Sequence, residues 1–334
     1  MKRYLLCVLG LAAMIMTAGC GKKDEGGNAA TDQQGKLTIA VIPKSTANEF
    51  WETVQAGAMT AAEELGVDVK WEGTVTETEI AEQNKIIENM VNLGVDGMAL
   101  APLNKRAMEK QVRNAVNAGI PVVVFDSAVE GDAHSSFVAT DNHKGGALGA
   151  EHMIELLGDN GGKVMVMRFV QGTGSTEARA AGFMETAEAA GIDIVADPYP
   201  DTGTIEGAKT VAVNTFEGFI EDGELELDGV FACNLVASLG VASALDDLRK
   251  SGVDVDVKFV GFDTSKKLVD ELQAGTIDAL VAQNPRRMGY LAVQTIVKVV
   301  RGEPVPDVVD TGVKLVTREK LENDPEIRKL VGLE

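Results

Sequence analysis

The chain has 334 residues, which exceeds the usual size of a single hydrophobic core and predicts two lobes. Apolar residues make up 45% of the chain and aromatic residues only 4%, so a core can form and each aromatic residue is informative on its own. The formal net charge of -20 argues against nucleic acid or anionic lipid as a partner of the folded body.

Residues 1–19 have the pattern of a secretory signal peptide. A basic start precedes an apolar run from Tyr4 to Met16 that is too short and wrongly flanked for a membrane-spanning helix. The ending TAGC resembles the bacterial lipobox, in which the cysteine, here Cys20, is acylated and becomes the first residue of the mature protein. A cysteine inside an ordinary cleaved signal is the alternative. We therefore expect a protein of the periplasm or cell envelope, anchored to the membrane by lipid at Cys20.

Residues 20–35 contain little that could be buried, so we expect a flexible tether between the lipid and the folded domain. Of the other two cysteines, Cys7 belongs to the signal and Cys233 lies in an apolar run. No intrachain disulfide is expected in the mature chain, and Cys233 is interpreted as a small buried residue.

The folded region begins with a strand, a polar loop and a helix. Residues 37–42 have the length and composition of a buried strand, and Asn48 is a good N-cap for a helix with apolar residues at helical spacing up to Leu65. In open α/β sheets ligands bind outside the carboxyl ends of the strands, which places Asn48, Phe50 and Trp51 within reach of a ligand. From position alone, the two aromatic side chains are more often core residues.

Strand and helix patterns then alternate along the chain. The first set has strands at 67–71, 97–101 and 121–125 and helices at 77–93 and 105–118. The helices end at Gly66, Gly94 and Gly119, as expected for C-caps. The pattern restarts with a strand near 137–141 and a helix at about 143–157, where we place the change of lobe.

The second set is of similar size. Its strands are at 163–170, 192–196, 229–233, 257–262 and 277–282, and its helices are at 176–190, 205–220, 236–250, 266–274 and 286–301. Strands separated by helices indicate parallel sheets, so the chain is predicted to be an α/β protein with two Rossmann-like, doubly wound lobes. The tail at 310–334 is interpreted as a short extended piece followed by weak helical turns around Glu319 and Pro325.

Polar side chains directly follow four of the predicted strands. They are two carboxylates and two amides, at Asp126, Asn234, Asp263 and Gln283. Each one alone is more often a cap or loop residue, but together they lie on the sheet edges where ligands bind. Arg179, which comes after the strand at 163–170, adds a fork of five donors, with a surface salt bridge as the alternative interpretation.

This set of side chains suits a neutral polyhydroxy ligand. Hydroxyls donate to carboxylates and accept from arginine, while aromatic ring faces cover C–H surface. A pentose has about ten heavy atoms, so micromolar binding at about -8 kcal/mol requires roughly -0.8 kcal/mol per atom. That efficiency requires nearly complete burial of the ligand, which two closing lobes can provide.

Eight segments occur in an order and spacing typical of one known family. They are TIAVIPKSTANEFWETVQAGA, GVDGMALAP, GIPVVVFDS, TDNHKGGALGA, EARAAGF, GVFACN, VGFD and ALVAQNPRRMGYLAV. Through them, residues 36–316 resemble the periplasmic sugar-binding proteins of bacterial ABC importers, of the ribose, allose and galactose type. The resemblance implies a type I periplasmic binding protein with a three-crossing hinge, one lobe formed by 36–140 plus 284–312 and the other by 141–283 plus 313–334.

The resemblance also assigns roles to residues. It makes Asn48, Phe50 and Trp51 ligand contacts of the amino-terminal lobe, with the two rings flanking a sugar, and Asp126 a hydroxyl acceptor with Ser127 beside it. The contacts implied for the carboxyl-terminal lobe and hinge are Arg179, Asn234, Asp263 and Gln283. The implied protein needs no cofactor and captures a monosaccharide for an ABC permease with its ATPase in the inner membrane. We expect a monomer.

Three positions depart from the ribose-binding pattern. Ala101 stands where ribose binders carry an asparagine, and Ser127 stands where they carry an arginine. Thr202 stands near the position of an aromatic wall. The loss of a charged donor fork at Ser127 leaves more space, which argues against ribose and favours a different or larger sugar, or another solute such as a polyol.

Enzymatic interpretations have weaker support. His134, His143 and His152 lack metal-ligand spacing, and the segment from Gly172 to Gly174 lacks the third glycine of a dinucleotide loop. Asp126 and Asp263 could form a glycosidase pair, which the separation of their carboxylates would decide.

Two non-enzymatic alternatives use the same fold. A transcription repressor is disfavoured because such proteins begin with a basic helix-turn-helix, whereas this chain begins with a signal and an acidic tether. A sensor that presents its closed form to a chemoreceptor or sensor kinase requires the same lobe closure as an importer. Sequence alone leaves the importer and the sensor as alternatives.

Overall fold

The computed structural model describes residues 35–158 and 161–333. The folded region forms one compact unit that starts at Lys36. The predicted signal peptide, Cys20 and all of the predicted tether except Gly35 lie outside the described residues. Within the described part of the chain, no helix combines the length and the apolar character needed to cross a membrane.

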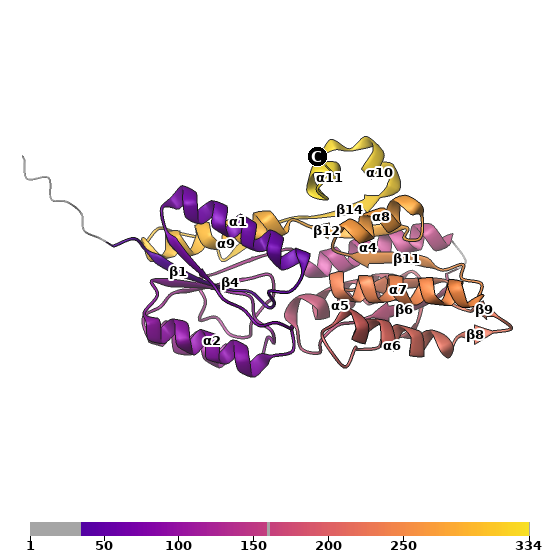
Figure 1. Ribbon diagram of the computed structural model, residues 1–334, viewed down its shortest axis with the longest axis horizontal. Helices are drawn as coiled ribbons and strands as arrows, with labels where there is room; N and C mark the ends of the chain where they lie inside the picture. The colour runs from indigo at the N-terminus through magenta and orange to yellow at the C-terminus, as the bar shows by residue number, and fades with distance from the viewer. Residues whose placement is uncertain (1–34, 159–160, 334) are drawn as a thin grey trace, which may run out of the picture. The chain divides into compact units, whose positions relative to one another are not determined.

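The first of two large sheets has six strands in the order β13-β5-β4-β3-β1-β2, and every neighbouring pair is parallel. The strands are β1 (Thr38–Ile42), β2 (Asp68–Trp71), β3 (Gly97–Leu100), β4 (Val122–Phe125), β5 (Ser136–Ala139) and β13 (Val308–Asp310). The helices that accompany it are α1 (Glu49–Leu65), α2 (Ile80–Leu93), α3 (Glu109–Asn117) and α9 (Pro285–Val300). We call this assembly the amino-terminal lobe (Figure 1).

The second sheet also has six strands, in the order β14-β12-β11-β10-β6-β7, and only β14 runs antiparallel to its neighbour. The strands are β6 (Lys163–Met167), β7 (Asp193–Ala196), β10 (Gly229–Ala232), β11 (Lys258–Phe262), β12 (Ala279–Gln283) and β14 (Val313–Thr317). Its helices are α4 (Asn142–Leu157), α5 (Gly174–Ala189), α6 (Ile205–Glu217), α7 (Leu235–Ser251), α8 (Lys266–Ala274), α10 (Arg318–Asn323) and α11 (Pro325–Leu330). We call this assembly the carboxyl-terminal lobe.

Each sheet is covered on both faces, as expected for parallel strands with crossover helices. In β1, Ile39 and Val41 belong to a different buried cluster from Ala40 and Ile42, because successive side chains of a strand point to opposite faces. Figure 1 shows α1 and α9 on one face of the amino-terminal sheet and α2 on the other. Central strands such as β3 and β4 therefore read as continuous apolar runs, whereas the edge strand β2 has exposed polar residues. The predicted α/β class is confirmed.

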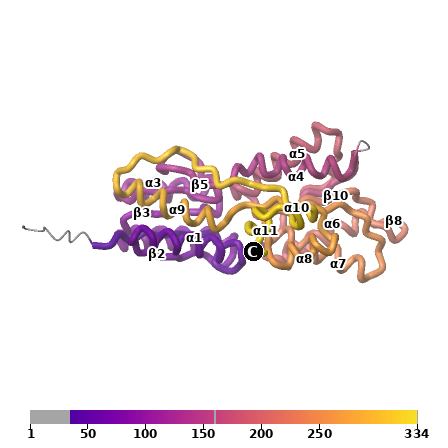
Figure 2. Tube along the Cα trace, turned by 90° about the horizontal axis from the view of Figure 1, so that it is seen from above, coloured from indigo at the N-terminus to yellow at the C-terminus, as the bar shows by residue number. Residues whose placement is uncertain are grey.

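The chain crosses from one sheet to the other three times. The passages lie between β5 and α4, between β12 and α9, and between β13 and β14. Figure 2 shows the consequence for α9, which lies beside α1 although more than two hundred residues separate them in sequence. Three passages join the carboxyl ends of both sheets to one hinge, so side chains that follow the strands of either sheet can meet.

Glycines bring two helix pairs into backbone contact. A Cβ atom at Gly57 would lie 1.9 Å from the carbonyl oxygen of Arg286, so only glycine allows α1 to approach α9 this closely. A Cβ atom at Gly146 would lie 2.0 Å from the carbonyl oxygen of Arg179, which imposes the same condition on α4 and α5. Close packing of α4 and α5 fixes the backbone position from which Arg179 extends.

The structure differs from the sequence-based expectation mainly at element ends. The helix expected at 205–220 ends at Glu217 and is followed by a hairpin of β8 (Ile220–Glu221) and β9 (Glu224–Leu225), turned by Asp222 and Gly223 in the left-handed region. The helix expected from residue 77 starts at Ile80, because Glu79 accepts from the backbone N–H groups of residues 75 and 76 and holds a turn there. The strand β13 was not predicted as a separate element.

Candidate functional site

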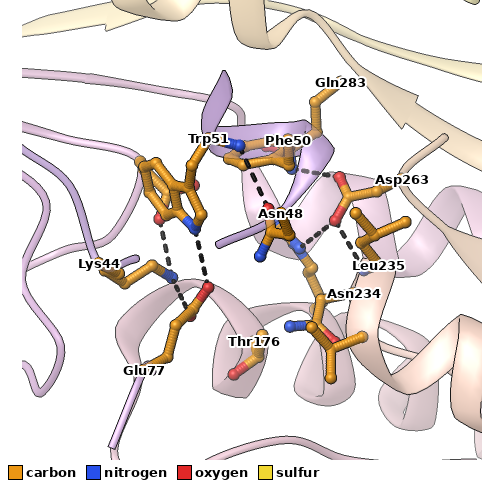
Figure 3. A pocket seen from close by; sticks show the side chains of 13 residues that line it. Lys44, Asn48, Phe50, Trp51, Glu77, Thr176, Asn234, Leu235, Asp263 and Gln283 are labelled. Carbon is orange, nitrogen blue, oxygen red and sulfur yellow. Dashed lines mark hydrogen bonds and ion pairs between the residues drawn. The ribbon is translucent and has the colours of Figure 1, made fainter. Parts of the chain in front are cut away.

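A small cavity lies where the carboxyl ends of the two sheets meet (Figure 3). The amino-terminal lobe lines it with Lys44, Asn48, Phe50, Trp51, Glu77 and Asp126. The carboxyl-terminal lobe lines it with Thr176, Arg179, Asn234, Leu235, Val236, Asp263 and Gln283. The cavity thus brings together eight of the nine predicted ligand contacts, and Ser127 is the one that does not line it.

Two aspartates enter the cavity from equivalent positions. Asp126 directly follows β4 and Asp263 directly follows β11, and both have left-handed backbone angles, with φ of 60° and 71°. The backbone N–H of each still donates to the neighbouring strand, to the carbonyl oxygens of Val138 and Val281 at 3.0 and 2.9 Å. This conformation is uncommon for residues other than glycine, and such residues cluster at functional sites.

Two asparagines serve as helix caps at the cavity wall. Asn48 caps α1, with its Oδ1 accepting from the N–H of Trp51 at 3.2 Å, and Asn234 caps α7, with its Oδ1 accepting from the N–H of Ala237 at 2.9 Å. Each cap occupies the carbonyl oxygen of the side-chain amide and leaves the Nδ2 donor for other partners. The two lobes therefore present one amide donor each.

The aromatic residues Phe50 and Trp51 are both core and cavity wall. Their side chains are buried, and their rings meet edge to face at 5.0 Å between centroids. The indole Nε1 of Trp51 donates to Glu77 Oε1 at 3.0 Å, and the same ring lies 6.2 Å from that of Phe125. Position alone favoured a core role for the pair; the structure places one edge of this core at the cavity.

Lys44 is the main site residue that sequence reasoning missed. Its Nζ lies 2.9 Å from Asp126 Oδ2 and 3.4 Å from Glu77 Oε2, and it donates to Ser175 Oγ at 3.2 Å. Burial by itself lowers the pKa of this lysine, but the charges of Asp126 and Glu77 outweigh burial and raise the pKa above 10.5. The signal was available, because Lys44 follows the first strand at its carboxyl end, as Asp126 follows the fourth.

Arg179 is buried, so the surface salt bridge considered for it is wrong. Its Nε donates to Asn142 Oδ1 at 2.8 Å, and its Nη1 donates to the carbonyl oxygen of Cys233 at 3.0 Å. The guanidinium also lies 3.7 Å from Asp263 Oδ2 and 3.9 Å from the ring centre of Phe262. These contacts hold the planar group in one orientation at the cavity wall.

Asp263 is held from two sides within its own lobe. Its Oδ1 accepts from Gln283 Nε2 at 2.6 Å, and its Oδ2 accepts from the backbone N–H of Leu235 at 3.0 Å (Figure 3). Burial raises the pKa of Asp263, although Arg179 and these two donors act in the opposite direction. The side chain of Gln283, at the end of β12, is thereby fixed at the hinge.

Three buried acceptor atoms at the cavity lack a hydrogen-bond donor among the described residues. They are Glu77 Oε2, Asp126 Oδ2 and Gln283 Oε1. The first two have the charge of Lys44 nearby without hydrogen-bond geometry. The ion pairs with Lys44 compensate the two carboxylates, whereas Gln283 Oε1 is left without a partner, which costs about 1–3 kcal/mol. The cavity therefore favours a ligand that brings donors.

The remaining sequence candidates lie away from the cavity. His143 and His152 pair with Glu185 and Glu155, each at 2.9 Å, and across the described ranges no cluster of His, Cys, Asp and Glu could hold a metal ion. Ala101 is buried and does not line the cavity, and Thr202 shares an exposed hydroxyl contact with Thr204.

Cys233 is a buried residue, as interpreted from the sequence, and its thiol is free within the part of the chain that the structure describes. Burial raises the pKa of its thiol to about 12, so the thiol stays protonated at neutral pH. Its backbone carbonyl accepts from Arg179, which makes this residue part of the support of the cavity wall.

Comparison with known proteins agrees with this architecture. Residues 39–304 match the periplasmic binding protein domain. The D-ribose/D-allose-binding protein of Pseudomonas aeruginosa is 30% identical over 92% of this chain and 97% of its own length. A carbohydrate transporter solute-binding protein of Agrobacterium radiobacter, solved with D-arabinose, is 33% identical with a TM-score of 0.81 and covers 89% of this chain and 99% of that one.

A further solved structure has the same level of similarity. It is an ABC transporter solute-binding protein of Agrobacterium vitis with bound D-fucose, 33% identical, with a TM-score of 0.81, covering 88% of this chain and 99% of that chain. Two doubly wound lobes with a polar cavity between them define a protein that binds a small molecule. The chain belongs to the periplasmic binding protein family.

Proposed function

We propose that this protein is the solute-binding component of an ABC transporter and that it binds a neutral monosaccharide in the cavity between its lobes. The observation that carries the proposal is a set of three buried acceptors around one cavity: Gln283 Oε1 has no donor, and Glu77 Oε2 and Asp126 Oδ2 have only the ion pair with Lys44. Sugar hydroxyls would supply the missing donors, and the same hydroxyls would accept from Asn48 and Asn234.

The charges at the cavity support a neutral ligand. Three carboxylates, of Glu77, Asp126 and Asp263, face two cations, of Lys44 and Arg179. An anionic ligand would meet this excess of acceptors at a desolvated site and lose its hydration without compensation. The aromatic wall of Phe50 and Trp51 suits the C–H surface of a sugar ring.

The relatives support the size class of the ligand. Their names or bound molecules are D-ribose, D-allose, D-arabinose and D-fucose, which are pentoses and hexoses. The cavity between the lobes is small, which favours such a sugar over a disaccharide. We infer that the lobes close over the sugar, and that the closed form delivers it to a membrane permease.

The cellular setting follows from the same proposal. The family acts in the bacterial envelope, and we infer that this chain is held there by lipid at Cys20, because the TAGC ending resembles a lipobox. The mass of the mature amino-terminal peptide, with or without acyl chains, checks this part separately from ligand binding.

A thermal-shift screen tests the proposed ligand class. The panel contains D-ribose, D-allose, D-arabinose, D-fucose, xylitol, a disaccharide and two amino acids. A ligand present at a hundred times its dissociation constant adds about 2.7 kcal/mol to the free energy of unfolding, which raises the melting temperature visibly. We expect one or two monosaccharides to raise it and the disaccharide to leave it unchanged.

Two results would count against the proposal. No shift with any sugar or polyol would remove the monosaccharide class, and a shift with an amino acid alone would replace it. An Asn48→Ala variant is the matched control, because it removes one donor at the cavity and should reduce the shift produced by any ligand bound there.

A further inference from the structure

Helix α5 begins in an unusual way. Its N-cap residue, Thr173, makes no hydrogen bond from its side chain to the first turn of the helix. The neighbouring helices α6, α7 and α8 are each capped by their own N-cap side chain, from Thr204, Asn234 and Ser265. The hydroxyl of Thr173 instead donates to the carbonyl oxygen of Leu103 in the amino-terminal lobe at 3.1 Å.

The missing cap comes from the other lobe. Ser127 Oγ, in the amino-terminal lobe, accepts from the backbone N–H of Ser175 in the first turn of α5 at 3.0 Å, and both residues are buried. Lys44 Nζ, also in the amino-terminal lobe, donates to the hydroxyl of the same Ser175 at 3.2 Å. One residue of α5 is therefore held through its backbone and its side chain by two residues of the opposite lobe.

The approach of the two lobes at this point depends on a glycine. A Cβ atom at Gly174 would lie 2.8 Å from the carbonyl oxygen and 3.0 Å from the nitrogen of Ala128. Two positions earlier, the carbonyl oxygen of Gly172 accepts from the backbone N–H of Lys105 at 3.0 Å. The segment from Gly172 to Ser175 thus fits against the amino-terminal lobe along its whole length.

We propose that Ser127 is a positioning residue that caps α5 from the opposite lobe and thereby holds the lobes closed. The cap is made only when the lobes meet, because its acceptor and its donor belong to different lobes. Ser127 does not line the cavity, but Thr176 and Arg179, on the same helix, do. Ser127 therefore sets ligand affinity through closure and not through contact with the ligand; this coupling to affinity rests on the proposed function.

The magnitude follows from helix capping. Removing a capping side chain typically weakens a helix by an amount equivalent to about fivefold in an equilibrium constant. Because the cap exists only in the closed form, the loss falls on the closed form alone. We expect Ser127→Ala to weaken sugar binding about fivefold, mainly through faster dissociation, since closure retains the ligand.

The binding experiment compares two variants at the contact between the lobes with two control variants. Ser127→Ala and Gly174→Ala act on the contact between lobes, whereas Thr204→Ala removes a cap within one lobe and Gly218→Ala adds a Cβ atom remote from the cavity. The Kd and dissociation rate are measured for whichever of D-ribose, D-allose, D-arabinose and D-fucose binds the wild type. Gly174→Ala should weaken binding more than Ser127→Ala, and the two controls should keep the wild-type values. Wild-type Kd and dissociation rate in Ser127→Ala would overturn the proposal.

A second measurement needs no ligand. All the contacts described join two protein atoms, so they stabilise closure of the unliganded protein too. Small-angle scattering without sugar should give a larger radius of gyration for Gly174→Ala than for the wild type and Gly218→Ala. Equal radii would overturn the proposal that these contacts hold the lobes closed. If no sugar binds the wild type, the proposed ligand class fails, and the scattering result still decides whether the contacts between lobes hold the lobes closed.

Discussion

Both lobes place an aspartate at the end of a buried strand, but the two aspartates have different partners. Each places an aspartate after a phenylalanine at the end of a buried strand, Asp126 in one lobe and Asp263 in the other, with a left-handed backbone and an N–H bonded to the next strand. Asp263 has both carboxylate oxygens engaged by donors of its own lobe. Asp126 Oδ2 faces Lys44 without a hydrogen bond of proper geometry.

The cationic side chains of the two lobes, Arg179 and Lys44, also differ in whether their partners belong to their own lobe. Arg179 uses its guanidinium on Asn142 and on the backbone of its own lobe, stacked over Phe262. Lys44 is a compact charge between two carboxylates, with one donor reaching the opposite lobe. The carboxyl-terminal wall therefore satisfies most of its own polar groups and leaves only Gln283 Oε1 without a donor. The amino-terminal wall depends more on other groups: on the other lobe at Lys44 and, under the proposed function, on a ligand at Asp126 and Glu77.

Of the substitutions that test this difference between the lobes, Lys44→Met should change the free energy of unfolding most. Lys44→Met leaves Asp126 and Glu77 buried with no neighbouring positive side chain of their own lobe, and breaking a buried ion pair costs about 3–5 kcal/mol. We expect the free energy of unfolding, measured by urea denaturation, to fall by about that amount. The double variant Lys44→Met with Glu77→Gln should recover part of the loss, because one buried charge is then absent.

The control for Lys44 is a lysine paired on the surface. Lys85 lies 2.8 Å from Glu82 on the exposed face of α2, and Lys85→Met should leave the urea midpoint close to that of the wild type. A Lys44→Met variant as stable as Lys85→Met would show that the buried carboxylates of Asp126 and Glu77 do not need the charge of Lys44, and the contrast drawn between the two lobes would fail.

The fold was predictable because its local signals agree with one another. Apolar runs, helical spacing and terminal glycines such as Gly66 and Gly94, which adopt the left-handed conformation of a C-cap, all favour alternating strands and helices. The hairpin after α6 was missed although Asp222 and Gly223 form a typical turn pair, because the helical pattern before it was extended too far.

The site was predictable as far as strand ends define it. Asp126 and Asp263 follow strands, and topology alone brings such residues to one edge of a sheet. Glu77 lies in a loop whose position depends on the indole of Trp51, so no periodic pattern indicates it. Ser127 was predicted as a ligand contact, but it does not line the cavity, and its partner is the end of a helix in the other lobe. Such a pairing depends on how the lobes meet.

Replacing each aspartate by asparagine tests the difference between the two lobes with smaller expected effects than Lys44→Met. Asparagine tolerates the left-handed backbone, so the change acts mainly on charge. Asp126→Asn should weaken sugar binding by about 1.5–3 kcal/mol, the value of a hydrogen bond to a charged group, with a smaller loss in the free energy of unfolding. Asp263→Asn should instead lower the free energy of unfolding by about 1–3 kcal/mol, because one of its internal donors loses an acceptor.

Calorimetric titration and urea denaturation of both variants separate these outcomes. The internal donors of Asp263 are Gln283 Nε2 and the N–H of Leu235, so the loss of either should appear in stability before it appears in binding. If both variants lose binding affinity and stability in equal proportion, the two carboxylates have the same role. The claim that Asp126 acts mainly in binding and Asp263 mainly in stability would then be wrong.

The smallest expected effect is a difference in pH dependence. The pKa of Asp263 is raised above its ordinary value of 3.8 by burial, so just above pH 3.8 the folded chain binds a proton more readily than the unfolded chain does. The free energy of unfolding of the wild type should therefore rise relative to Asp263→Asn as the pH falls from neutral toward 3.8.

The raised pKa of Lys44 acts at the opposite end of the pH range. Its stabilising contribution is complete below pH 10.5, the ordinary value, and is lost as the pH rises through the higher pKa of the folded state. The wild type should thus lose its advantage over Lys44→Met only in strong alkali. Urea denaturation across both ranges checks the two differences, and curves that run parallel at both ends would mean that neither buried group titrates differently in the folded and unfolded chains. An acid difference without an alkaline one would assign the pH dependence to the carboxyl-terminal wall alone.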